Sequence, residues 1–185
     1  GLSPTEILRK CTRIMALLPI IVAPAPRLKV RCEAVAEVTK ELRALMEDML
    51  DTMYDAPGIG LAAPQVGVTK RIIVVDVAKG DDAPNPYLMV NPEITWHSDE
   101  PFEYEEGCLS LPEQYAKVTR PDAIRLTYLD KNGAAQELDA NGILATCIQH
   151  EMDHLDGVLF VDHISKLRRD LIIRKLKKYK AAQSV

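Results

Sequence analysis

The first third of the chain carries a helical pattern of apolar residues. Between residues 33 and 53, apolar positions recur at alternating steps of three and four residues: Val35, Val38, Leu42, Leu45 and Met49. This spacing aligns them on one face of a helix. The pattern predicts an amphipathic, core-facing helix from Glu33 to Met53. The next segment, Asp55 to Gln65, is rich in Gly and Pro and indicates a structured loop.

The middle of the chain carries the patterns of β-strands. Arg71 to Val77 (RIIVVDV) is a β-branched run, and apolar and polar residues alternate from Ala123 to Leu129 (AIRLTYL). The turn sequence Asp130-Lys-Asn-Gly then leads into Ala135 to Leu138, which is a hairpin signal. We therefore expect antiparallel sheet between Leu88 and Asp139.

Two further helices are predicted near the C-terminus. One runs from Gly142 to Leu155 and ends at Gly157, a residue type that commonly stops helices. The other is opened by Ser165, and its apolar side comprises Leu167, Leu171, Ile172, Leu176 and Tyr179. Helices at both ends of an antiparallel middle, without regular βαβ alternation, indicate an α+β fold. We expect antiparallel β-sheets packed around the central helix at residues 142–155, with an N-terminal amphipathic helix and a C-terminal helix.

Composition indicates one ordinary globular domain over residues 1–185. The chain is 47% hydrophobic and 27% charged with a formal net charge of -4, which excludes disordered and fibrous classes. Its length is sufficient to bury one substantial core. Residues 1–14 match no predicted element, so they are interpreted as an upstream extension, a transit-peptide remnant or a vector-derived segment.

No segment has the length of a membrane helix. The longest apolar run, Met15 to Pro26, contains three prolines and falls short of the roughly 20 residues that a bilayer requires. The prolines also argue against a signal peptide, although basic residues precede the run. A reducing compartment is favoured because no CxxC pair occurs among the four cysteines, Cys11, Cys32, Cys108 and Cys147.

Charge is segregated toward the C-terminus. Residues 165–185 contain eight Lys or Arg and one Asp, a local balance of +7 that leaves -11 on the rest of the chain (-4 minus 7). A solvated helix face is the commoner explanation of such a run. The alternative is a surface that binds the phosphates of a nucleic acid.

The sequence Gln149-His-Glu-Met-Asp-His154 contains an H-E-x-x-H pattern. On a helix, the four-residue spacing stacks His150 and His154 on one face, close enough to bind one metal ion. Glu151 projects beside them, where it can accept a proton from an attacking water. The pattern predicts a metal-dependent hydrolase, while the simpler alternative is a helix with two surface histidines.

A catalytic metal normally has three protein ligands, so a third is needed. The extended pattern with a third histidine is rejected because Phe160 stands where that histidine would fall, and no Glu follows Glu151. The remaining downstream candidates are Asp153, Asp156, Asp162 and His163. Helical periodicity angles Asp153 and Asp156 away from the two histidines.

An upstream candidate is Cys108, in the sequence Glu106-Gly-Cys-Leu-Ser-Leu-Pro112. A thiolate there would complete a Cys/His/His site with an open fourth position for water. A lone cysteine is more often a small buried hydrophobic residue. Spacing alone leaves both interpretations open.

Three segments together resemble one family: Gly58-Ile-Gly-Leu-Ala-Ala-Pro-Gln65, Glu106-Gly-Cys-Leu-Ser110 and Gln149-His-Glu-Met-Asp-His154. They resemble the three signature motifs of peptide deformylase, in the same order, in a single catalytic domain. The resemblance extends from about Leu17 to the C-terminal helix. Leu109 after the cysteine is similar to bacterial or plastid forms.

The resemblance implies removal of the N-formyl group from the initiator methionine of nascent polypeptides, with release of formate. It implies Cys108, His150 and His154 as metal ligands and Glu151 as the acid–base residue. Gln65 and the backbone N–H of Leu109 would stabilise the developing oxyanion. Ferrous iron is the implied physiological metal, and zinc, nickel or cobalt can occupy such a site.

The resemblance also implies partners and a location. The partners are nascent N-formyl-Met polypeptides, and for some bacterial members the ribosome, which the basic C-terminal helix would contact. The implied location is the cytoplasm, or a plastid or mitochondrion if residues 1–14 are a transit remnant.

A substrate site is predicted around the same helix. Ile143, Thr146 and Cys147 share the helical face of His150, and with Ile59 they would line an apolar pocket for methionine. The backbone at Ile59 and Gly60 would pair with an extended peptide as an added strand. The simpler interpretations are a tight turn at the glycines and ordinary core packing on the helix.

Two other functions are compatible with the H-E-x-x-H pattern. A zinc peptidase would be favoured by a downstream Glu or a third His ligand, and neither is present. A metal-stabilised binding module would leave Glu151 without a task.

Overall fold

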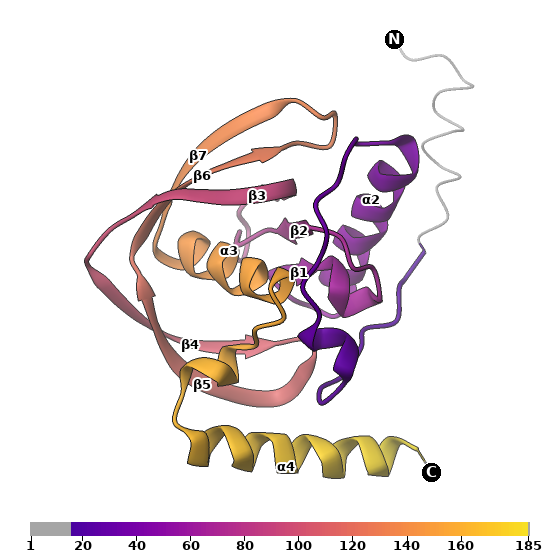
Figure 1. Ribbon diagram of the computed structural model, residues 1–185, viewed down its shortest axis with the longest axis vertical. Coiled ribbons are helices and arrows are strands. Elements are labelled where there is room, and N and C mark those ends of the chain that lie inside the picture. The colour runs from indigo at the N-terminus through magenta and orange to yellow at the C-terminus, as the bar shows by residue number, and fades with distance from the viewer. Residues whose placement is uncertain (1–15, 185) are drawn as a thin grey trace.

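The computed structural model describes residues 16–184, and it has two antiparallel sheets and three α-helices there (Figure 1). The helices are α2 (Lys40–Asp55), α3 (Gly142–Leu155) and α4 (Lys166–Gln183), and short 3-10 helices cover η1 (Pro26–Lys29), η2 (Ala63–Val66) and η3 (Phe160–His163). The predictions for residues 1–14, including Cys11, lie outside the described part. None of the helices within residues 16–184 combines the length and apolarity needed to span a bilayer.

The larger sheet has the strand order β1-β2-β3-β6-β7, and β4 and β5 form a separate two-stranded sheet. All pairings between these strands are antiparallel. The strand bounds are β1 (Gly60–Ala62), β2 (Ile72–Val75), β3 (Tyr87–His97), β4 (Pro101–Cys108), β5 (Leu111–Pro121), β6 (Ala123–Leu129) and β7 (Ala135–Asn141). The α+β class predicted from the sequence is confirmed.

The central position of α3 follows from where apolar side chains can be buried. In β2, Ile73 and Val75 pack in the cluster that contains Ile148 of α3, whereas Ile72 and Val74 pack in the cluster that contains α2. Because successive strand residues point to opposite faces, both faces of β2 are covered, which is why its sequence is uniformly apolar. Figure 1 shows α3 lying between the larger sheet and the β4–β5 hairpin.

The first helix begins later than its periodicity suggested. The prediction was a start at Glu33, but α2 starts at Lys40, where the Thr39 side chain accepts a hydrogen bond from the backbone N–H of Leu42. Val35 instead exchanges two hydrogen bonds of 2.8 Å with the side chain of Asn91, which holds it in an extended segment. Val35 is nevertheless buried. It fitted the helical period because it is apolar, but it is buried as part of the extended segment that precedes α2.

Other boundaries differ in smaller ways. The strand predicted from Arg71 to Val77 covers Ile72–Val75, and the loop predicted from Asp55 to Gln65 contains β1 and the start of η2. The hairpin of β6 and β7 is confirmed with its turn at Asp130, although β7 continues to Asn141. The predicted bounds of α3 match the observed ones.

Helix α4 starts where Ser165 caps it, as predicted, but its packed side is narrower than predicted. Ile172 and Leu176 are buried in the cluster with Phe160 of η3 and Leu111 of β5. Leu167 is 72% exposed and Leu171 is 45% exposed, so the assignment of these two residues to the packed side was wrong. The helix lies against the hairpin side of the molecule (Figure 1), and only one narrow stripe of it faces protein.

Candidate active site

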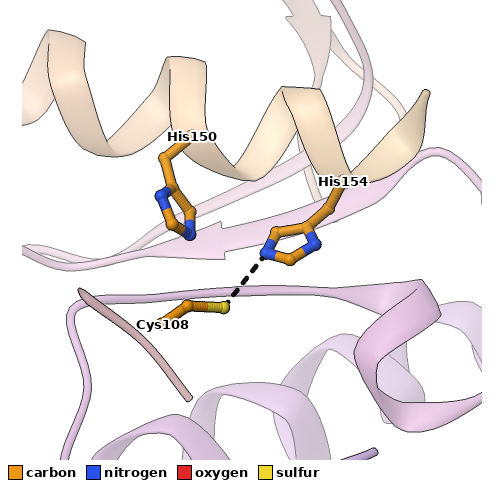
Figure 2. A group of neighbouring side chains, drawn as sticks. All are labelled: Cys108, His150 and His154. Atoms are coloured by element: carbon orange, nitrogen blue, oxygen red, sulfur yellow. Dashed lines mark hydrogen bonds between the residues drawn. The ribbon is translucent and has the colours of Figure 1, made fainter. Parts of the chain in front are cut away.

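Three candidate metal ligands converge between α3 and the end of β4. Cys108, His150 and His154 offer one ligand atom each, and these atoms all lie within 4.8 Å of one another. Figure 2 shows the two imidazoles descending from successive turns of α3 toward the sulfur, with His154 Nε2 3.4 Å from Cys108 Sγ. Donors bound to one tetrahedral ion lie about 3.3–3.7 Å apart. The residues present therefore fit a divalent ion bound by one thiolate and two imidazoles.

The other candidates for the third ligand are engaged elsewhere. Asp153 accepts one hydrogen bond of 2.8 Å from Arg120 and contacts His163 at 2.8 Å, and Asp156 pairs with Arg71 at 3.0 Å. Asp162 is paired with Lys29 at 2.7 Å. Among the sequence candidates, Cys108 is the one whose donor atom lies with those of His150 and His154.

The local backbone explains how Cys108 reaches α3. The β4–β5 register shifts between Gly107, which pairs with Tyr115, and Cys108, which pairs with Leu111. An irregularity of this kind bends a strand and redirects the side chain that follows it. Cys108 therefore leaves the regular pleat of the hairpin beside the histidine face of the helix.

Glu106 orients the first histidine. Its buried carboxylate lies 2.8 Å from His150 Nδ1 and accepts hydrogen bonds of 2.8 and 3.0 Å from the Arg120 guanidinium. Burial alone would raise the pKa of Glu106, but the contacts with His150 and Arg120 outweigh it and lower the pKa to about 2. A carboxylate at Nδ1 keeps the proton on that nitrogen and leaves Nε2 free to bind a metal.

Glu106 and Arg120 are functional candidates that the sequence analysis did not assign. The weak signal for Glu106 was its position two residues before Cys108 in a short motif. Arg120 gave no signal, because its partners Glu106 and Asp153 come from a neighbouring strand and from α3.

Glu151 lies beside the candidate ligands in an environment that changes its acidity. Its Oε1 is 3.7 Å from His150 Nε2, and its buried Oε2 has no hydrogen-bond partner among the described residues. Burial raises the pKa of Glu151 to about 7, although the neighbouring His150 opposes this. Gly60 packs directly against it, since a Cβ on Gly60 would lie 2.7 Å from Oε1.

The second histidine is held in its neutral form. Burial lowers the pKa of His154 well below its ordinary value, and the nearby His150 lowers it further. A neutral imidazole is the form that binds a metal ion.

Gln65 presents its amide to the Cys108 turn. Its Oε1 accepts a hydrogen bond of 2.9 Å from the backbone N–H of Ala62, which orients the amide. Its Nε2 donates to Ser110 Oγ at 3.0 Å and lies 3.5 Å from Cys108 Sγ. The amide donor therefore points to the same place as the candidate ligands.

A cavity of about 750 Å³ opens onto this group. Leu109, Cys108 and Glu151 line it. So do all five residues that were predicted to bind substrate: Ile59, Gly60, Ile143, Thr146 and Cys147. Gln65 and His154 are buried, and both contact Cys108, which lines the cavity. Burial raises the pKa of Cys147 well above its ordinary value, and its thiol donates to Ile59 O at 3.4 Å, so Cys147 is a poor nucleophile.

Comparisons with known proteins agree on one family. Residues 17–170 match the family model described as polypeptide deformylase. Among curated relatives, the peptide deformylase of Methylocella silvestris is 56% identical over 167 residues, which cover 89% of this chain and 85% of that protein. The peptide deformylase of Phenylobacterium zucineum is 55% identical over 168 residues, covering 91% and 99%.

Solved structures agree with the sequence comparisons. The crystal structure of peptide deformylase from Ehrlichia chaffeensis is 40% identical, with a TM-score of 0.87 over 92% of this chain and all of that one (100%). The same enzyme in complex with actinonin is 42% identical, with a TM-score of 0.86 over 89% and 98%. With a Cys/His/His group and a buried glutamate at one cavity, this chain belongs to the peptide deformylase family, the metal-dependent enzymes that remove the N-formyl group from nascent polypeptides.

Proposed function

We propose that Cys108, His150 and His154 hold the metal of this deformylase and that Glu151 is its acid–base residue. The observation that carries the proposal is the convergence of three donor atoms within 4.8 Å beside a buried carboxylate at the cavity. A divalent ion held there would acidify a bound water and polarise the formyl carbonyl.

The protein groups divide the remaining work. Glu151 takes one proton from the attacking water while the water oxygen forms a bond to the formyl carbon. Negative charge then develops on the formyl oxygen, where Gln65 Nε2 and the backbone N–H of Leu109 donate hydrogen bonds. As the C–N bond breaks, Glu151 delivers its proton to the leaving nitrogen. The products are formate and a peptide with a free amino group.

Formate release from a formyl-Met peptide tests this assignment. Glu151→Gln keeps the shape of the side chain but removes the base, so kcat should fall by about 10²–10⁴-fold. Metal content should stay at the wild-type level, because Glu151 is not proposed as a ligand. Glu103→Gln, on an exposed carboxylate outside the cavity, is the matched control. Wild-type kcat in a metal-loaded Glu151→Gln protein would contradict the role.

We further propose that Ile59, Gly60, Ile143, Thr146 and Cys147 bind the substrate. The half-buried Ile143 lies at the start of α3, where a larger side chain would enter the cavity. Ile143→Trp should therefore raise KM for formyl-Met peptides, and unchanged kinetics would refute the pocket. Gly60 supports the backbone part of the site because β1 leaves an open edge at the end of the sheet order.

Ferrous iron is the metal that we propose for the physiological enzyme, with zinc, nickel or cobalt as possible substitutes. A thiolate and two imidazoles suit all of these ions, so the donor set supports the site without selecting the metal. The Cys108 thiolate can be oxidised, and iron would promote that reaction. Activity should decay faster in air for the iron form than for the nickel form, and equal decay would count against iron.

We also propose that α4 docks the enzyme at the ribosome, and that it acts in the bacterial cytoplasm where nascent chains emerge. Exposed cations on α4 support this: Arg168, Arg174, Lys175, Lys177 and Lys178. Deleting the helix is unsuitable as a test because Ile172 and Leu176 belong to the core.

Charge reversal tests the ribosome contact without removing the helix. The double variant Lys175→Glu, Lys178→Glu should weaken ribosome binding and reduce its dependence on salt, because fewer phosphate contacts release fewer counterions. The control is Lys79→Glu, Lys131→Glu, on exposed residues away from α4. Equal affinity of both variants and the wild type would eliminate the proposal.

A further inference from the structure

The rim of the cavity is acidic. Four glutamates line it, and no Lys or Arg does. Two of them are committed to the interior: Glu106 is paired with Arg120, and Glu151 is buried beside His150. The other two, Glu105 and Glu113, are exposed and make no ion pair with any residue of the described chain. Lys117, which lies opposite Glu105 in the β4–β5 ladder, pairs with Glu103 outside the cavity, so the Glu113 carboxylate is the exposed charge at the turn itself.

An aromatic ring stands at the same rim. Tyr115 is 61% exposed, the highest value among the exposed aromatic residues of the described chain. It pairs with Gly107 across the β4–β5 hairpin, and a Cβ on Gly107 would lie 2.6 Å from the Tyr115 ring. The ring is therefore laid against the backbone of the residue that precedes Cys108.

Shielding of the Gly107 backbone accounts for the contact that one side of the Tyr115 ring makes, but not for the exposed side. An aromatic side chain across from a strand glycine covers the exposed backbone there, and this needs no ligand. The exposed remainder of the ring lines the cavity beside Glu113. Glu113 itself has φ 63°, a left-handed conformation that is rare for residues other than glycine. The turn thus holds a carboxylate and an aromatic ring together at an open site.

The substrate direction determines what meets this rim. On the site proposed above, the formyl group must reach the buried Glu151, so the residues after methionine extend toward the exposed lining of the cavity, which includes Glu113 and Tyr115. An aromatic face attracts a Lys or Arg side chain, and a nearby carboxylate adds a second attraction. An acidic side chain at the same place would be repelled by Glu113 and Glu105.

We propose that Tyr115 and Glu113 form a subsite that selects a Lys or Arg side chain in the peptide segment downstream of the formyl-methionine. The inference rests on the metal and Glu151 assignments made above, but it concerns substrate preference rather than chemistry. Because each contact is exposed, the preference for Lys over Ala should be modest, about three- to tenfold in kcat/KM.

A peptide series measures the preference directly. Formyl-Met peptides carrying Lys, Ala or Glu at the second, third or fourth position are compared by formate release at low salt. We expect kcat/KM in the order Lys, Ala, Glu at one of these positions. The Lys-to-Glu ratio should fall at 0.5 M salt, because exposed charges are screened there.

Variants assign the preference to the two residues. Glu113→Gln and Tyr115→Ala should each reduce the Lys-to-Glu ratio by about threefold or more, while Tyr115→Phe should retain the part due to the ring. Glu103→Gln removes an exposed carboxylate of the same hairpin outside the cavity and should leave the ratio unchanged.

Equal kcat/KM for Lys and Glu at all three positions of the wild type would overturn the inference. So would a Lys preference that survives unchanged in both Glu113→Gln and Tyr115→Ala. The Ala peptide separates this result from a failure of the chemistry, because wild-type protein that releases no formate from it would speak against the active-site assignment instead.

Discussion

At the scale of single residues, one buried carboxylate organises the candidate metal site. Glu106 contacts His150 Nδ1 and Arg120, so it links a β4 strand residue to α3 and to β5. Arg120 carries the link on to Asp153, one residue before His154. The orientation of His150 and the spacing of α3 from the hairpin thus depend on the same charged group.

Replacing Glu106 should weaken metal binding more than replacing any exposed glutamate. Glu106→Gln removes the charge that holds His150 Nδ1–H and leaves Arg120 with one acidic partner, so we expect metal affinity to fall by about 10- to 100-fold. Competition with a chelator, followed by metal analysis, measures this. Glu103→Gln is the control, and equal affinity of the two variants would show that Glu106 does not orient the ligand.

At the scale of elements, the start of α2 shows how periodicity and capping can disagree. Val35 and Val38 continue the apolar period of the helix backward, yet Thr39 supplies the N-cap and the chain before it is extended. The bridge between Glu33 and Lys70 holds this extended segment against the chain that enters β2. A helical period therefore does not by itself locate a helix boundary.

Removing the cap tests the observed boundary. Thr39→Ala loses the acceptor for Leu42 N–H, so it should lower the free energy of unfolding by about 1 kcal/mol. Urea denaturation measures the change. Glu37→Ala, an exposed residue two positions earlier, should change it by less than about 0.5 kcal/mol. If the helix began at Glu33, Thr39 would lie in its interior, and Thr39→Ala should then raise the free energy of unfolding instead of lowering it.

At the scale of the whole molecule, Asp162 ties together segments that are far apart in the sequence. It accepts hydrogen bonds from Lys29 Nζ at 2.7 Å, Arg169 Nε at 2.8 Å and Leu159 N at 2.9 Å. Partial burial would raise the pKa of Asp162, but these donors outweigh it and lower the pKa. The Asp162 carboxylate therefore connects the N-terminal segment with η3 and α4.

The lowered pKa of Asp162 predicts the sign of a pH effect. A carboxyl group whose pKa is lower in the folded state stabilises the fold above its ordinary pKa of about 4 and loses that effect as pH falls below it. Asp162→Asn should cost about 1–2 kcal/mol in the free energy of unfolding at pH 7, and the difference from wild type should shrink below pH 4. Urea denaturation of the wild type and the variant at pH 7 and at pH 3 tests this.

Asp170→Asn serves as the control for Asp162. Asp170 pairs with Lys166 on the exposed side of α4, so its loss should change stability far less. If the difference in the free energy of unfolding between the wild type and Asp162→Asn were as large at pH 3 as at pH 7, the charge of Asp162 would not be the cause of the stabilisation.

Short-range patterns determined much of the candidate site. The H-E-x-x-H spacing placed His150, Glu151 and His154 on one helix, and the predicted bounds of that helix match α3. The turn at Asp130 and the alternation beside it were sufficient for the β6–β7 hairpin. These features could be predicted because each depends on residues within a few positions of one another.

Tertiary structure decided the remainder. Spacing could not choose Cys108 over Asp162 or His163 as the third donor, and it gave no reason to connect Glu106 with Arg120 and His150. Those contacts join a hairpin to a helix that lies later in the chain, so they depend on how separate apolar faces pack and not on any local period. The same packing moved Val35 out of the helix and left Leu167 and Leu171 in solvent, because an apolar side chain is buried only where the fold has a neighbour for it.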